Sequence, residues 1–130
     1  MKFKSRLLGL LVLGFSVNAV AANEYAITCI ENRTNDRVYF DWHNAGEFAW
    51  RQGYIIANGV GGIYLRFQYP DQNAAPRLFI NLDTDLSSNV YRQQFELERW
   101  ASPSQDCNGA VHYVLEYEYG NRGALRFYKR

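Results

Sequence analysis

Apolar and polar residues alternate with a period of two along most of the chain, and this pattern restricts the possible folds more than any other feature of the sequence. The alternation is clear in residues 38–43, 63–69, 77–83, 91–98, 111–119 and 125–128, and residues 48–56 are a weaker candidate. Successive side chains of a β-strand point to opposite faces, so each of these segments would bury one face and expose the other. No helical period of useful length follows the first 22 residues. We therefore predict an all-β protein.

The alternating segments are separated by clusters of Gly, Asn, Asp, Ser and Pro, which are the residues that favour turns. The clusters lie at residues 32–36, 44–46, 58–62, 70–73, 87–89, 102–106 and 120–123. Short strands between turns at nearly regular intervals are typical of antiparallel sandwiches and small barrels. We expect a single antiparallel β-sandwich, or a small barrel, of seven or eight strands.

The last two segments would form a hairpin whose core faces must stay in register across the turn. A three-residue loop of residues 121–123 would pair Tyr117 with Phe127 and Glu118 with Arg126. This loop would place Gly123 in the left-handed conformation that a three-residue loop with a bulge requires. We therefore predict a three-residue loop.

The first 22 residues have the pattern of a secretory signal peptide. Three basic residues occur among the first six, an apolar run follows at residues 7–17, and small residues lead up to Ala22. The apolar run is shorter than the roughly 20 residues that a membrane-spanning helix needs. We predict that residues 1–22 are a cleaved signal peptide and that residues 23–130 form one domain, exported to the periplasm or the medium without stable membrane insertion.

The charge balance argues against a nucleic-acid partner. The full chain carries a formal net charge of +1, and removal of Lys2, Lys4 and Arg6 with the leader would leave −2. Nucleic-acid-binding domains usually show a basic excess. With 48% hydrophobic and 21% charged residues, the composition is that of a packed globular protein and not of a disordered chain.

The two cysteines, Cys29 and Cys107, are expected to form a disulfide in an oxidising compartment. In a regularly alternating antiparallel fold, however, their strands would place them at opposite ends of the domain. We expect one of two solutions: residues 101–109 fold back over the sheet, or residues 48–56 do not cross the whole domain. A catalytic cysteine is the less favoured alternative, because only two histidines could activate it.

Two groups of polar residues could take part in chemistry. Asp41 and His43 are two residues apart, so the carboxylate could orient the imidazole of a small hydrolase. The serines, however, lack the context of a nucleophile elbow. Asp83 and Asp85 could begin a calcium site, but no glutamate follows at a suitable distance. We predict no catalytic residue, no metal ligand and no cofactor, and convergence of these four residues in one pocket would favour an enzyme instead.

Aromatic residues are abundant, at 16% of the chain, and exceed what a small sandwich can bury. Tyr, Trp and Arg are enriched where proteins bind partners. We predict a non-catalytic binding protein, of the inhibitor, immunity or host-directed effector type, whose partner is a protein or a glycan. The alternatives are the hydrolase described above and a carbohydrate-binding module that uses Trp50 and Trp100. The predicted binding residues are Tyr39, Trp50, Tyr64, Arg66, Arg77, Phe79 and Trp100.

Overall fold

The computed structural model describes residues 24–56, 64–88 and 93–130. The predicted signal peptide, residues 1–22, lies outside the described residues. The described residues form nine strands, namely β1 (Tyr25–Asn32), β2 (Val38–Asn44), β3 (Arg51–Ile55), β4 (Tyr64–Tyr69), β5 (Leu78–Leu82), β6 (Gln93–Leu97), β7 (Trp100–Ser102), β8 (Val111–Glu118) and β9 (Asn121–Lys129). Within these ranges, no helix has the length and apolar character of a membrane span.

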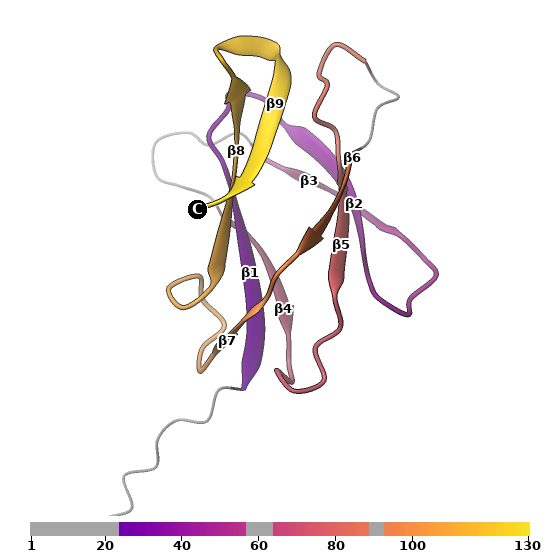
Figure 1. Ribbon diagram of the computed structural model, residues 1–130, viewed down its shortest axis with the longest axis vertical. Coiled ribbons are helices and arrows are strands. Elements are labelled where there is room, and N and C mark those ends of the chain that lie inside the picture. The colour runs from indigo at the N-terminus through magenta and orange to yellow at the C-terminus, as the bar shows by residue number, and fades with distance from the viewer. Residues whose placement is uncertain (1–23, 57–63, 89–92) are drawn as a thin grey trace, which may run out of the picture.

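The strands form two sheets that pack face to face, as Figure 1 shows. One sheet has the order β4-β1-β8-β9, with β7 also paired to β1, and the other has the order β3-β2-β5-β6. The predicted β-sandwich is confirmed. The ninth strand, β7, was not expected, because its three residues are too short to show an alternating pattern.

One strand pair departs from the predicted antiparallel arrangement, because β1 and β8 run parallel. Both β7 and β8 lie on the same side of β1, β7 beside Tyr25–Ile27 and β8 beside Thr28–Asn32. The chain runs antiparallel to β1 through β7 and then reverses in the connection that follows. It therefore enters β8 in the same direction as β1, and no regular alternation of strand directions could have predicted this pair.

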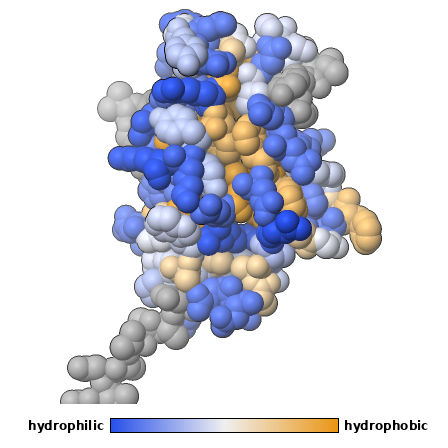
Figure 2. Space-filling view, viewed as in Figure 1, coloured by the Kyte–Doolittle hydropathy of each residue, from blue (hydrophilic) through white to orange (hydrophobic). Residues whose placement is uncertain are grey.

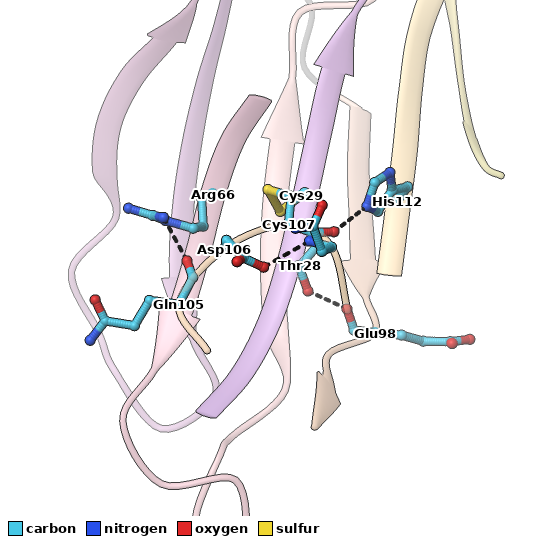
Figure 3. The surroundings of a disulfide bond; sticks show 9 residues. Thr28, Cys29, Arg66, Glu98, Gln105, Asp106, Cys107 and His112 are labelled. Atoms are coloured by element: carbon cyan, nitrogen blue, oxygen red, sulfur yellow. Dashed lines mark hydrogen bonds between the residues drawn. A yellow bond between two sulfur atoms is a disulfide. The ribbon is translucent and has the colours of Figure 1, made fainter. Parts of the chain in front are cut away.

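The reversal also brings the two cysteines together. Cys29 and Cys107 form a disulfide with a Cα–Cα distance of 6.0 Å, which confirms the predicted bond. The first of the two expected solutions is correct for most of its residues, because residues 103–110 fold back over the outer face of the five-stranded sheet (Figure 3), whereas Ala101 and Ser102 belong to β7 within the sheet. A small second core of Ile27, Cys29 and Ala110 forms beneath this segment.

The main core lies between the two sheets and contains the inward-facing residues of the alternating segments. Its buried members are Ile30, Val38, Phe40, Ile55, Phe67, Leu78, Ile80, Leu82, Leu97, Val111, Tyr113, Leu115 and Leu125. Figure 2 shows an apolar strip along the middle of the molecule, between the two layers. The rings of Phe95 and Phe127, from the edge strands β6 and β9, meet across the layers with their centroids 4.8 Å apart.

The loop predicted for the last hairpin is wrong. The turn consists of Tyr119 and Gly120, both with positive φ, and the register pairs Tyr117 with Leu125 in place of Phe127. The predicted ion pair of Arg126 therefore forms with Glu116 instead of Glu118. Gly120, and not Gly123, is the glycine that adopts the left-handed conformation before β9, and Tyr119 adopts it as well, so two residues are enough for the turn.

The irregular part of β9 has a partner that the sequence does not suggest. Leu125 N donates to Thr84 O at 2.8 Å, and Leu86 N donates to Gly123 O at 2.9 Å. The start of β9 thus pairs with the segment after β5, which belongs to the opposite sheet. These bonds provide partners for backbone groups at the start of the edge strand β9.

Candidate binding face

The candidate site is the outer face of the four-stranded sheet, which faces away from the core. Alternation along β2 points Tyr39, Asp41 and His43 outward, whereas Phe40 is buried in the core. The cross-strand register then brings the outward residues of β3 and β5 beside them. We call seven residues the aromatic face: Arg37, Tyr39, His43, Trp50, Tyr54, Arg77 and Phe79.

The first group on the aromatic face is a pair of tyrosines with an arginine. Tyr39 lies directly opposite Tyr54, and their rings meet edge to face at a centroid distance of 6.2 Å. The Arg37 guanidinium lies 4.4 Å from the centre of the Tyr54 ring, within the range of a cation–π interaction. Since Tyr39 and Tyr54 are 50% and 48% exposed, about half of each side chain remains available to a partner.

The second group is centred on His43. The imidazole lies between the ring of Trp50, at 4.1 Å, and the ring of Phe79, at 5.3 Å, and it is stacked on Phe79. The Arg77 guanidinium lies 5.4 Å from the centre of the Phe79 ring and 3.6 Å from the Glu96 carboxylate. Contacts on both sides hold the imidazole in place, while Trp50 keeps 39% of its surface exposed.

A polar row separates the two aromatic groups. Asp41 is the register partner of Gln52 on one side and of Asn81 on the other, and Asn81 is the partner of Gln94. Neighbouring outward residues on adjacent strands are close enough for their side chains to interact. The row therefore places three amides and one carboxylate side by side across the sheet.

The connection between β2 and β3 adjoins the second group, and we call residues 45–50 the Phe48 loop. The Glu47 carboxylate accepts hydrogen bonds from the backbone and side-chain nitrogens of Asn44, both at 3.2 Å, and lies 3.4 Å from Arg51. The hydrogen bonds from Asn44 and the nearby Arg51 charge lower the pKa of Glu47. Phe48 is 102% exposed, so its ring is not covered by the rest of the protein.

The structure brings four of the seven predicted binding residues together. Tyr39, Trp50, Arg77 and Phe79 belong to the aromatic face. The other three lie on the five-stranded sheet, with Tyr64 and Arg66 in β4 and Trp100 in β7.

The surroundings of Arg66 and Trp100 differ from those of the aromatic face. Arg66 donates to the Gln105 carbonyl at 2.5 Å and so anchors the segment that contains the disulfide (Figure 3). Trp100 is 47% exposed, and its ring centre lies 5.8 Å from the Lys129 ammonium. Neither Arg66 nor Trp100 shares a sheet with the aromatic face, so the seven residues do not form one surface.

Several residues of the candidate site were not selected from the sequence. Tyr54 lies in the weakly alternating segment, and its role as the partner of Tyr39 depends on the register of β2 and β3. Arg37 precedes β2, and the spacing of His43 from Asp41 suggests a catalytic group and not a binding residue. Phe48 could have been found only if its turn had been recognised as a projecting one, because a phenylalanine between two strands is normally expected in a core.

Three of the four residues proposed as a possible catalytic or metal site, namely His43, Asp83 and Asp85, take part in local structure. His43 Nδ1 lies 2.9 Å from the Asn44 carbonyl, so the backbone occupies one ring nitrogen. Asp83 N donates to Tyr39 O at 3.1 Å, and Asp83 is buried, with 8% of its surface exposed. Asp85 Oδ1 accepts hydrogen bonds from the backbone nitrogen and the hydroxyl of Ser87, at 3.0 and 2.5 Å. The two hydrogen bonds between Asp85 and Ser87 are those of an Asp-stabilised turn.

Neither of two hollows on the surface is lined by these four residues. The larger, of about 680 Å³, lies beside Pro76, Leu97, Arg99 and Ala101, and the smaller, of about 580 Å³, lies beside the disulfide. In residues 24–56, 64–88 and 93–130, no three His, Cys, Asp or Glu side chains are grouped so that they could hold a metal ion. Comparison with known proteins found no matching family model, no matching curated protein and no matching solved structure.

Proposed function

We propose that this chain is an exported, non-catalytic binding protein that recognises a macromolecular partner through the aromatic face. The observation that carries the proposal is the arrangement of two aromatic groups, each with its own arginine, on one outer face. The outer face of the opposite sheet is partly covered by residues 103–110. The four-stranded sheet is therefore the better candidate for a docking surface.

The chemistry of the aromatic face suits a protein contact. Tyrosine, tryptophan and arginine dominate the binding energy of most protein interfaces, because they combine a large apolar surface with polar groups. The face is also ordered before binding, since its tyrosines project from paired strands and His43 is stacked between two rings. Little side-chain entropy would then be lost when the partner binds.

The size and the predicted leader favour a small exported inhibitor, immunity protein or host-directed effector. The disulfide suits an oxidising compartment outside the cytoplasm. A partner in the same compartment is therefore the first to be sought.

A glycan partner is the second candidate, and the polar row favours it. Amides and carboxylates bind sugar hydroxyls through hydrogen bonds, while aromatic rings pack against the apolar faces of sugar rings. The row of Gln52, Asp41, Asn81 and Gln94 lies between two such aromatic groups. The polar row replaces the pair of Trp50 and Trp100 as the basis for a glycan partner, because Trp50 lies beside the four-stranded sheet and Trp100 lies in the five-stranded one.

The test compares two matched arginine–tyrosine pairs. Residues 23–130 are immobilised and exposed to an extracytoplasmic extract of the source organism, as the wild type, as Arg37→Ala/Tyr54→Ala, and as Arg126→Ala/Tyr128→Ala. Arg126 lies 5.1 Å from the centre of the Tyr128 ring on the opposite sheet, so the second variant removes the same chemistry elsewhere. Thermal unfolding verifies that both variants are folded.

We expect the wild type and the Arg126→Ala/Tyr128→Ala variant to retain the same protein equally well. The Arg37→Ala/Tyr54→Ala variant should bind that protein at least about tenfold more weakly. Equal retention by both variants would contradict the proposal. A glycan array is run in parallel with Asn81→Ala. Binding to an array glycan that this substitution abolishes, without any protein retained, would favour the second candidate.

A further inference from the structure

Phe48 is the most exposed of the large hydrophobic side chains among the described residues, and it lies in the Phe48 loop next to the aromatic face. Figure 2 shows apolar surface projecting at the side of the molecule where Figure 1 places the connection between β2 and β3. We propose that Phe48 is an anchor that inserts into a concave, apolar pocket of a protein partner. This inference rests on the proposed binding function and names the kind of surface that the partner must offer.

Hydrogen bonds hold the backbone of the Phe48 loop in place, although the side chain of Phe48 itself is fully exposed. Glu47 N donates to Asn44 O at 3.0 Å, which closes a turn, and Gly46 adopts a φ of +88° within it. The Glu47 carboxylate accepts two further hydrogen bonds from Asn44. Ala45 N donates to Arg77 O at 2.7 Å and joins the loop to the segment that leads into β5, the strand next to β2.

The base of the loop is tied to a third part of the chain. Asn44 is 7% exposed, and its side-chain oxygen accepts a hydrogen bond from Arg99 at 2.7 Å. The same guanidinium donates to the Pro76 carbonyl at 2.5 Å. A loop braced from several sides holds its tip in one place, so a partner would bind it with little loss of conformational freedom.

The surroundings of Phe48 indicate the chemistry of the partner. Gly46 and Ala49 have no polar side-chain atoms, and the carboxylate of Glu47 is already bound by Asn44 and Arg51, so the tip offers little that could bind sugar hydroxyls. The nearest charges, Glu47 and Arg51, have opposite signs and pair with each other, which gives no net attraction to an anionic membrane. A projecting ring with charges only around its base matches the arrangement of an interface anchor, whose partner supplies an apolar pocket.

The loop also continues the surface already described. Trp50, two residues after Phe48, contacts His43 on the aromatic face. A partner that received Phe48 would therefore lie against the second aromatic group as well. The loop and the face can still be tested separately, because Arg37 and Tyr54 belong to the first group.

The experiment uses the full chain, exported by its source organism, with a photoreactive phenylalanine analogue at position 48. The matched control carries the same analogue at position 119, because Tyr119 is also at the tip of a turn and is 94% exposed. Phe48→Ala and Tyr119→Ala are compared as baits in the capture experiment described above. Neither substitution removes a buried contact, so both variants should retain the melting temperature of the wild type.

We expect a crosslinked protein adduct from position 48 and not from position 119. We also expect Phe48→Ala to weaken capture of the same protein by at least about 30-fold, and Tyr119→Ala to change it less than about threefold. Equal crosslinking from both positions, or unchanged capture by Phe48→Ala, would overturn the inference. If Phe48→Ala captures normally while Arg37→Ala/Tyr54→Ala does not, the anchor is wrong and the proposed function stands.

A second experiment tests whether Phe48 inserts into a lipid membrane instead of a protein pocket. Vesicles of phosphatidylcholine and phosphatidylglycerol are added to residues 23–130, and the tryptophan emission and co-sedimentation are measured. We expect neither a blue shift nor sedimentation. A blue shift and sedimentation that Phe48→Ala abolishes would show that the loop inserts into lipid and would overturn the inference of a protein pocket.

Discussion

Gly53 in the edge strand β3 lies directly opposite Phe40 in β2, and the Phe40 ring covers the glycine so closely that a Cβ atom at position 53 would stand 2.6 Å from its Cζ. Phe40 is 4% exposed, and its ring contacts that of Phe67 in the opposite sheet at 5.8 Å. The ring therefore packs between a glycine on its own sheet and an aromatic residue across the core.

Gly53→Ala should destabilise the fold by about 1–3 kcal/mol, because the ring of Phe40 cannot move away without disturbing the core. Guanidinium unfolding measures the loss. Phe40→Leu/Gly53→Ala is the informative control, since a smaller side chain at position 40 leaves room for the new methyl group. The cost of Gly53→Ala should be smaller in the Phe40→Leu background, and an equal cost in both backgrounds would show that the contact is not its cause.

Loss of the disulfide should lower the free energy of unfolding by about 4 kcal/mol, because it closes a long loop in the unfolded chain. The two cysteines are 78 residues apart. The measurement is guanidinium unfolding of Cys29→Ala/Cys107→Ala against the wild type, each with and without reductant. Reductant should lower the stability of the wild type only, and a loss below about 1 kcal/mol would contradict the loop-closure argument.

Asn44→Ala should cost about 2–3 kcal/mol, because it removes two hydrogen bonds at a buried position and leaves Arg99 with one partner fewer. Burial lowers the pKa of Arg99, and within the described residues its Nε already lacks a hydrogen-bond partner. In the Arg99→Met background the same substitution should cost clearly less. Additive losses would mean that the two side chains do not stabilise each other.

Acid should weaken the base of the Phe48 loop through Glu47. Its pKa in the folded protein lies below the ordinary 4.5, since Asn44 donates to its carboxylate and Arg51 is close. The stabilising contribution is therefore complete above the ordinary pKa and is lost as the pH falls through the lower, folded value. The stability difference between wild type and Glu47→Gln, followed by urea unfolding, should shrink in that window. A difference independent of pH would refute the assignment.

Much of the secondary structure could be predicted from the sequence because strand formation leaves a local pattern. The alternation in residues 38–43, 77–83 and 111–119 lies close to β2, β5 and β8. The inward residues of these segments form the core as expected. The weaker segment, 48–56, contains β3, although the strand begins only at Arg51. Its first residues form the Phe48 loop, whose phenylalanine resembles a core residue in the sequence.

The candidate site was predicted only in part, because a shared face depends on strand pairing. Tyr39, Trp50, Arg77 and Phe79 come together since β2 lies between β3 and β5. Arg66 and Trp100 were also expected outside the core, yet their strands belong to the other sheet. The alternation of apolar and polar residues predicts which side chains point away from the core. It does not predict to which sheet their strand belongs.

The sequence by itself determined the all-β class, most strand positions and the pairing of two cysteines, because period-two alternation and a single cysteine pair are local or compositional features. Only the tertiary structure decided the parallel pairing of β1 with β8, the turn at Tyr119 and Gly120, and the exposure of Phe48. These features depend on backbone hydrogen bonds and contacts between segments far apart in the chain. The free energy of such contacts depends on how distant segments pack together, and this packing cannot be inferred from the sequence of any one segment.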